Sequence, residues 1–178
     1  MSAPDYEDLI RRNRKRPLAR PADLPIRLDL GRDQIERIIP HRAPFLLVDR
    51  LTGLDLETGT VTGERLIAAD DPLFRGHFPG YPVYPGTLQV EMIGQLGLCL
   101  WYFLTRNRAT LGEDAAPVDV RATRILGAAF LEPLPPSSRV EIVGRKLDHD
   151  GYFARMIGQL LRDGKVASVA IGEVVFPG

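Results

Sequence analysis

The sequence predicts an α+β domain in which an antiparallel sheet wraps around one buried helix. Residues 88–104 are apolar on nearly every face, a pattern typical of a helix that is buried on all sides. After this segment, β-like runs of alternating residues are joined by Asp-Gly turns in "HDGY" and "RDGK", which favour antiparallel hairpins. Strand-like runs also precede the helix, and this order of elements is typical of an α+β domain.

The first 32 residues differ in composition from the rest, so we expect a basic extension over 1–32 and a single folded domain over 33–178. Residues 10–25, "IRRNRKRPLARPADLP", contain six Lys or Arg and three prolines and cannot sustain a hydrophobic period. One short helix is expected near residues 6–14. The extension is either a solvated tail or an arm packed on a neighbour, or it is a docking patch for an acidic partner.

The elements of the domain follow from the hydrophobic pattern and from the positions of Pro and Gly. A short helix is expected to start near Asp33 and to end at Pro40. Within the central helix, Gly94 and Gly97 each cost about 1 kcal/mol relative to alanine, so we expect another backbone to approach there. The expected strands lie within residues 45–56, 58–68, 118–134, 138–164 and 165–176, and irregular loops cover 70–86 and 106–117.

The composition argues against several classes of protein. The formal net charge is +0, which provides no general attraction to nucleic acid. Cys99 is the only cysteine, which excludes an internal disulfide, and its apolar neighbours indicate a core residue rather than a nucleophile. The N-terminus has no apolar signal region and no run of about 18 apolar residues occurs, so we expect a soluble, cytoplasmic protein with no membrane segment.

The stretch 75–86, "RGHFPGYPVYPG", places one of only three histidines in a loop stiffened by three prolines. Such a loop can hold His77 in place, while its glycines allow the backbone to approach a ligand closely. Fourteen residues later, Glu91 lies in the first turns of the apolar helix, where a carboxylate requires a partner. Glu91 is therefore a candidate catalytic acid; alternatively, it caps the helix or faces solvent near the helix N-terminus.

The start of the central helix is a candidate site for a developing negative charge. Pro85, Gly86 and Thr87 form an entry whose first N–H groups have no helical partner. A base, an acid and an oxyanion donor in this arrangement suit proton abstraction next to a carbonyl, coupled to loss of a polar group.

His41 and His149 are not at metal-ligand spacing with Cys or acidic residues, so we expect no metal, and we expect His149 at the surface. Fingerprints of serine hydrolases, P-loop proteins and dinucleotide-binding proteins do not occur.

Two segments resemble signatures of the (3R)-hydroxyacyl-[acyl-carrier-protein] dehydratases of the FabZ type, which have the hotdog fold. They are "IIPHRAPFLLVDR" at 38–50 and "GHFPGYPVYPGTLQVEMIGQ" at 76–95, and a weaker resemblance extends over 33–176. The resemblance implies that His77 and Glu91 are the catalytic pair. It further implies that the Gly86 N–H polarises the thioester carbonyl, that the Val83 carbonyl orients His77, that Gln95 supports Glu91, and that Phe78, Tyr84 and Leu88 line the substrate tunnel.

The resemblance also implies a reaction and an assembly. The expected enzyme is a hydro-lyase that converts a β-hydroxyacyl thioester on acyl carrier protein to the trans-2-enoyl thioester, without a cofactor, in synthesis of the fatty-acid or polyketide type. Glutamate at position 91, in place of aspartate, favours this branch over dehydratase-isomerases. A homodimer, or a trimer of such dimers, is expected to share each site between His77 of one chain and Glu91 of the other. A hotdog thioesterase and a non-catalytic acyl-binding subunit remain the alternatives.

Overall fold

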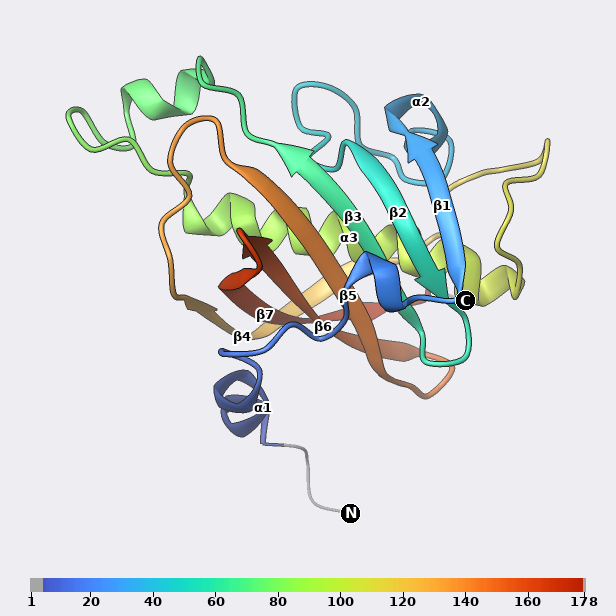
Figure 1. The fold of residues 1–178 in the computed structure, drawn as a ribbon. Coiled ribbons are helices and arrows are strands. Elements are labelled where there is room, and N and C mark those ends of the chain that lie inside the picture. The colour runs from blue at the N-terminus through green and yellow to red at the C-terminus, as the bar shows by residue number, and fades with distance from the viewer. Residues whose placement is uncertain (1–4, 178) are drawn as a thin grey trace.

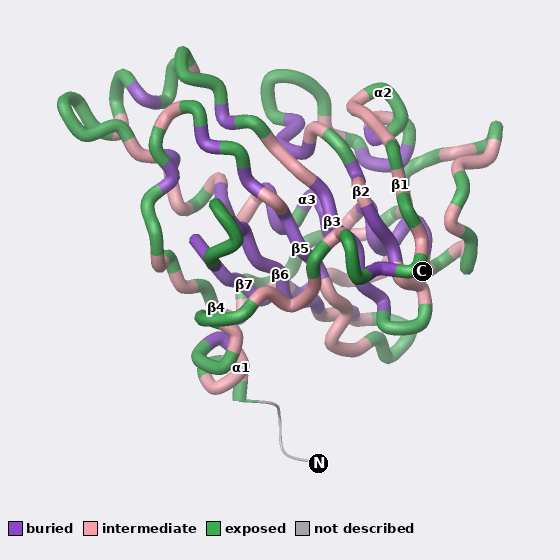
Figure 2. Tube along the Cα trace, viewed as in Figure 1, coloured by how far each residue is buried: buried purple, intermediate pink, exposed green. Residues whose placement is uncertain are grey.

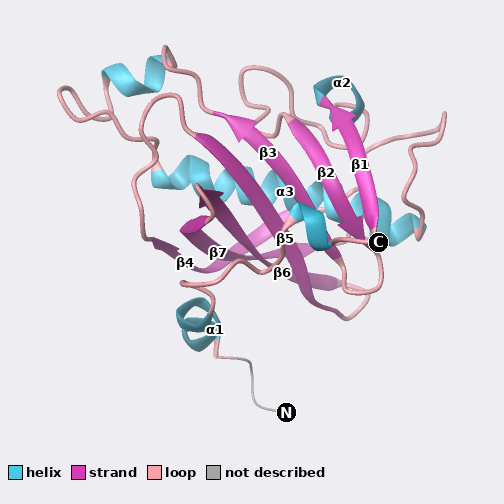
Figure 3. Ribbon diagram, viewed as in Figure 1, coloured by secondary structure: helices cyan, strands magenta, loops and turns pink. Residues whose placement is uncertain are grey.

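A computed structural model describes residues 5–177 (Figure 1). A seven-stranded antiparallel sheet with strand order β1-β2-β3-β5-β6-β7-β4 curves around the long helix α3 (Figures 1 and 3). The elements in chain order are α1 (Tyr6–Arg12), η1 (Pro21–Asp23), β1 (Ile26–Gly31), α2 (Arg32–Ile35), β2 (Arg50–Asp55), β3 (Thr60–Leu66), η2 (Pro72–Arg75), α3 (Gly86–Arg106), β4 (Arg121–Phe130), β5 (Arg139–His149), β6 (Phe153–Arg162) and β7 (Lys165–Val175). This is the hotdog arrangement, so the predicted fold class is confirmed.

Helix α3 is the buried helix that its apolar pattern predicts. It packs against β3, β5, β6 and β7. Its largest fully buried side chains include Trp101, Tyr102 and Phe103, and the purple segments of Figure 2 mark buried residues in β2, β3, β5, β6 and β7, whereas β1 and β4 are intermediate or exposed throughout. Cys99 lies in the same core, and burial raises its pKa to about 12, which confirms that it is a core residue.

No other backbone among the described residues approaches closely at Gly94 or Gly97 of α3, contrary to our expectation. A Cβ at Gly97 would collide with Sδ of Met156, so a side chain, and not another backbone, approaches the helix there. A Cβ at Gly94 would meet no atom within 4 Å. The expectation of a close backbone was therefore wrong at both positions, because β6 presents Met156 to Gly97 and a cavity lies beside Gly94.

The strands after α3 agree with the sequence pattern, whereas those before it differ in extent. The β5–β6 and β6–β7 hairpins turn at the predicted Asp-Gly positions. The strand expected over 45–56 begins only at Arg50, because the backbone N–H of Leu47 donates to the side chain of Gln95 instead of to a strand. Residues 26–31, which the prediction assigned to the extension, form β1 and pair with β2.

The N-terminal segment packs on the outer face of the sheet. Ile10 of α1 is buried against Ile157, Val169 and Ile171, which alternate along their strands with residues of the main core and so lie on the opposite face from α3. Figure 1 shows α1 beyond β4 and β7, on the side away from α3. Among the described residues, no helix is long and apolar enough to cross a membrane.

Candidate active site

The loop that carries His77 is closed by its own hydrogen bonds. The backbone N–H of His77 donates to the Leu73 carbonyl at 2.9 Å, and the Val83 N–H donates to the His77 carbonyl at 2.9 Å. The imidazole Nδ1 lies 2.8 Å from the carbonyl oxygen of Val83. Because a carbonyl oxygen can only accept, Nδ1 carries the proton in the neutral ring and Nε2 presents its lone pair. This geometry suits a base, and the Val83 contact is the one that the resemblance implies.

His77 opens onto a cavity of about 370 Å³ at the start of α3, which Val83, Tyr84, Gly86 and Gln89 also line. A Cβ at Gly86 would lie 2.9 Å from the ring of Phe130, so a larger residue at this position would require the ring to move. The Pro85 carbonyl accepts from the N–H groups of residues 88 and 89, both at 3.1 Å. Among the described residues, the Gly86 N–H has no backbone partner and is available to a substrate oxygen.

Glu91 is held in the second turn of α3 by side chains, and does not cap the helix. Its Oε1 accepts from Nε2 of Gln95 at 2.8 Å, and its side chain is only 34% exposed. Gln95 also accepts from the Leu47 N–H at 2.7 Å and donates to the Phe45 carbonyl at 2.8 Å. Gln95 therefore contacts Glu91 directly, and it also connects the loop before β2 to the helix.

His41 is a site residue that our sequence reasoning missed. Its Nε2 lies 3.3 Å from Oε1 of Glu91. We had considered this histidine only as a metal ligand, and spacing alone provides no reason to place it beside Glu91. The available signal was its position inside "IIPHRAPFLLVDR", one of the two segments that carry the resemblance.

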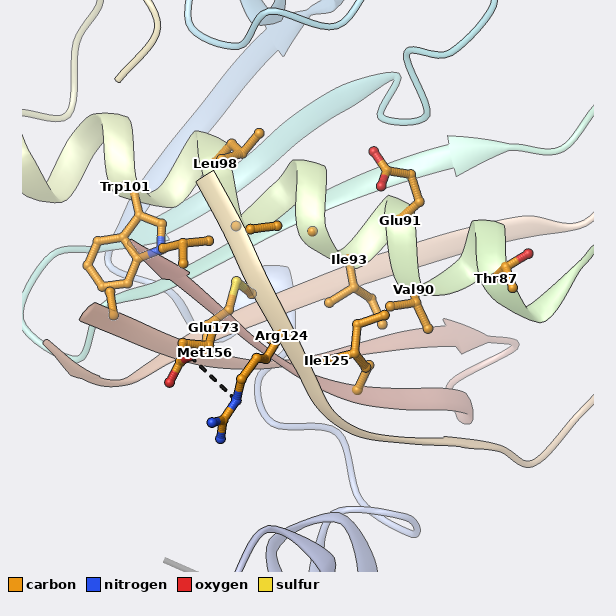
Figure 4. Close-up of a pocket in the computed structure, with 17 residues that line it drawn as sticks. Thr87, Val90, Glu91, Ile93, Leu98, Trp101, Arg124, Ile125, Met156 and Glu173 are labelled. Atoms are coloured by element: carbon orange, nitrogen blue, oxygen red, sulfur yellow. Dashed lines mark ion pairs between the residues drawn. The ribbon is translucent and has the colours of Figure 1, made fainter. Parts of the chain in front are cut away.

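A second cavity of about 190 Å³ runs along α3 between the helix and strands β4, β6 and β7 (Figure 4). Thr87 and Glu91 lie near one end and Trp101 at the other, and a helix advances about 15 Å over the ten residues from 91 to 101. Its lining is mostly apolar. Glu173 also lines the cavity, and its buried carboxylate accepts hydrogen bonds from Arg155 at 2.8 Å and from Thr123 at 3.0 Å. Because both oxygens already have partners, we interpret Glu173 as a structural residue and not as a catalytic one.

The three residues expected in the substrate tunnel lie in different environments. Phe78 is exposed and stacks on the His77 ring, with ring centroids 4.1 Å apart. Tyr84 is buried beside Phe74, and burial raises the pKa of its hydroxyl. Leu88 is half-buried and lines a third cavity, next to Pro44 and Phe45.

Among residues 5–177 of one chain, His77 lines the 370 Å³ cavity and Glu91 the 190 Å³ cavity, and neither of these two cavities contains both residues. The cavity beside His77 contains Gly86, and the one beside Glu91 contains Thr87, so the two halves of the expected site lie on different sides of the start of α3. His149 is exposed, as expected, at the end of β5.

The hotdog fold and the candidate site indicate a dehydratase of the hotdog class. Comparison of the sequence with known protein families agrees with this class. The model of the FabA-like domain matches residues 39–170, and the chain therefore belongs to the FabA-like family. Among curated proteins, the chain is 35% identical over 139 residues to a 3-hydroxyacyl-[acyl-carrier-protein] dehydratase FabZ of Campylobacter hominis, covering 78% of this chain and 91% of that protein. It is also 35% identical over 148 residues to a FabZ of Roseiflexus castenholzii, covering 83% and 95%.

Solved structures agree in fold. The dehydratase heterocomplex ApeI:P from Xenorhabdus doucetiae matches with a TM-score of 0.57 and 19% identity, covering 81% of this chain and 91% of the other. The PaaI protein from E. coli matches with a TM-score of 0.54 and 11% identity, covering 72% and 78%. At these identities the likeness shows the fold alone.

Proposed function

We propose that this protein is a 3-hydroxyacyl-[acyl-carrier-protein] dehydratase, a hydro-lyase of the FabZ type. The observation that carries the proposal is the His77 ring, whose Nδ1 is held by the Val83 carbonyl so that Nε2, which has no hydrogen-bond partner among residues 5–177, is available in the cavity that Gly86 also lines. The names of the FabZ relatives support the reaction and the carrier-bound substrate.

The proposed mechanism uses only groups of the protein and the substrate. Nε2 of His77 takes the proton from the α-carbon, and the electron pair of that C–H bond forms the Cα=Cβ bond. The Gly86 N–H stabilises the negative charge that develops on the thioester oxygen. The Cβ–O bond breaks, and the leaving oxygen takes a proton from Glu91 and departs as water. The products are the trans-2-enoyl thioester and one water molecule.

The same proposal includes a homodimer with shared sites. β4 is an edge strand of the sheet, and its residues Ile125 and Phe130 are 67% and 53% exposed. An exposed apolar edge is unfavourable in a free monomer and is typically covered by a partner. A two-fold partner that supplies Glu91 to the His77 of its neighbour would explain why one chain separates these residues. Assembly of such dimers into a trimer stays a prediction.

The partner and the pathway are narrower proposals. Acyl carrier protein is the proposed carrier, because the FabZ relatives are named for it. Fatty-acid synthesis is the primary proposal for the pathway, with polyketide-type synthesis as the variant to test. The cytoplasmic location also stays a prediction.

Mass spectrometry of the carrier protein after incubation tests the proposal directly. Carrier-bound 3-hydroxyacyl chains of several lengths should lose one water and remain attached to the carrier. Release of free acid would instead identify a thioesterase, and unchanged substrate at every length would identify a non-catalytic binding subunit. The chain length that reacts fastest would distinguish the pathways.

A further inference from the structure

Two side chains approach one and the same oxygen of the Glu91 carboxylate. Oε1 lies 2.8 Å from Nε2 of Gln95 and 3.3 Å from Nε2 of His41. No donor among residues 5–177 contacts Oε2. The two oxygens of the Glu91 carboxyl group therefore differ in their polar contacts: Oε1 has two and Oε2 has none among the described residues.

His41 is itself held in a defined place. Ile38 and Ile39 before it and Leu46 and Leu47 after it are buried in the main core, so both ends of its loop are anchored. Between them, the guanidinium of Arg42 donates to the carbonyls of Ile39 and of His41 at 3.0 and 2.8 Å. Gln95 ties the same loop to α3 through its bonds to Phe45 and Leu47. The imidazole is presented to Glu91 by a fastened loop.

The ring nitrogen that faces away from Glu91 determines which tautomer fits. Nδ1 of His41 is buried and has no hydrogen-bond partner among the described residues. A buried N–H without an acceptor is costly, whereas a lone pair without a donor costs less. The single proton of the neutral ring therefore belongs on Nε2, the nitrogen that lies 3.3 Å from Oε1 of Glu91.

We infer that His41 is a positioning residue for the proton donor. Because the Gln95 amide donates to Oε1 and Nε2 of His41 lies 3.3 Å from the same oxygen, Oε1 is the less favourable place for a proton, and the proton of the acid resides on Oε2. Oε2 then delivers the proton to the leaving hydroxyl, and the His41 and Gln95 donors stabilise the carboxylate that remains. The inference rests on the proposed function, because it takes Glu91 as the acid.

A double-mutant cycle tests whether His41 acts through Glu91. The wild type, His41→Leu, Glu91→Gln and the double variant are compared for kcat and KM on 3-hydroxybutyryl-[acyl-carrier-protein]. We expect His41→Leu to lower kcat about tenfold, the scale of one close polar contact to a charged group, with KM changed less than about twofold. In the Glu91→Gln background, His41→Leu should cause no further loss.

Two further variants separate positioning from packing. His41→Gln, whose amide N–H can reach the place of Nε2, should restore most of kcat. His41→Asn has an amide that ends near the place of Nδ1, and it should behave like His41→Leu. An equal loss in the presence and absence of Glu91 would overturn the inference, as would failure of both His41→Leu and His41→Asn to fold. A wild-type protein that does not dehydrate the substrate would overturn the proposed function and this inference together.

Discussion

Among the described residues, Nδ1 of the His77 ring contacts a backbone carbonyl, whereas Nε2 does not. The residue that supplies this carbonyl lies only a few positions away in the sequence. Val83, six positions after His77, accepts from Nδ1 at 2.8 Å. Glu91 depends on more distant partners, since its carboxylate is placed by Gln95 and by the loop that contains His41. At the scale of single residues, the proposed base is therefore positioned locally and the proposed acid by tertiary contacts.

His77→Ala and Glu91→Gln should each lower the rate of dehydration by at least about a hundredfold, the usual scale for a positioned base or acid. Steady-state kinetics with a 3-hydroxyacyl carrier substrate measures the loss, and circular dichroism checks that each variant folds. Glu57→Gln, an exposed carboxylate in the β2–β3 turn, is the control and should retain the wild-type rate. Near-normal turnover in either active-site variant would remove that residue from the mechanism.

Cys99 should be unreactive in the native protein. Burial raises the pKa of its thiol to about 12, so almost no thiolate forms near pH 8, and the core excludes the reagent. A colorimetric disulfide reagent should detect no thiol in the native protein and one thiol per chain in denaturant. Rapid labelling of the native protein would show that the core around α3 opens.

At the scale of elements, the N-terminal segment is held to the sheet by one buried amide. Nε2 of Gln159 donates to the carbonyls of Asn13 and Arg16 at 2.6 and 3.1 Å, and Oε1 accepts from the Leu18 N–H at 2.7 Å. Arg145 adds a bond to the Leu18 carbonyl at 2.6 Å. This segment lies on its own chain's sheet, so the interpretation as a freely solvated tail does not fit residues 5–25.

Replacing Gln159 should loosen this segment. Gln159→Met keeps the volume but removes all three bonds, and with each bond contributing about 0.5–1.5 kcal/mol we expect a loss of about 1.5–4.5 kcal/mol in unfolding free energy. Trypsin should cleave within residues 11–20 faster than in the wild type, while the sheet remains resistant. Unchanged cleavage would show that Ile10 and the apolar contacts suffice to hold the segment.

The basic charges of this segment allow a test of docking to an acidic carrier protein. Arg14, Lys15 and Arg16 are exposed and form no ion pair among the described residues. Changing all three to Gln should raise KM for carrier-bound substrate, most strongly at low salt, and leave a small thioester mimic unaffected. Deleting residues 1–20 is a poorer test, because it removes Ile10 and uncovers apolar side chains of β6 and β7. Equal effects on both substrates would indicate a purely structural segment.

At the scale of the whole molecule, the separation of His77 from Glu91 makes assembly a requirement of the proposed mechanism. Each residue lines its own cavity in one chain, and the exposed edge of β4 is the surface that a partner can cover. In a two-fold dimer, every contact occurs twice, so a site shared by two chains also occurs twice.

Mixed dimers test this arrangement. When His77→Ala and Glu91→Ala chains are unfolded and refolded together, about half of the dimers are mixed, and each mixed dimer has one intact site of two. Activity should return to about a quarter of the wild-type value by this counting. Each variant refolded alone is the control and should stay inactive. A mixture that is dimeric by sedimentation and yet inactive would reject shared sites.

Much of the fold and part of the site could be predicted from the sequence, because their signals are local. The apolar run of α3 and the Asp-Gly hairpins specify their elements through periodicity and turn chemistry. The loop of His77 is likewise stiffened by its own Pro and Gly residues. Strand β1 was missed although Ile26, Leu28 and Leu30 alternate, because the surrounding prolines and charges dominated that segment.

The remaining features depend on contacts between segments that are distant in the chain. Gln159 bonds to a residue 146 positions before it, and Gln95 to one 48 positions before it, and no local pattern encodes such partners. The same holds for His41 beside Glu91 and for Met156 against Gly97. The sequence by itself determined the buried helix and the hairpins, and it selected His77 and Glu91 as the proposed catalytic pair. Only the tertiary structure decided how Glu91 is held, where the basic segment lies and which cavity each residue faces, because these depend on how the sheet curves around α3.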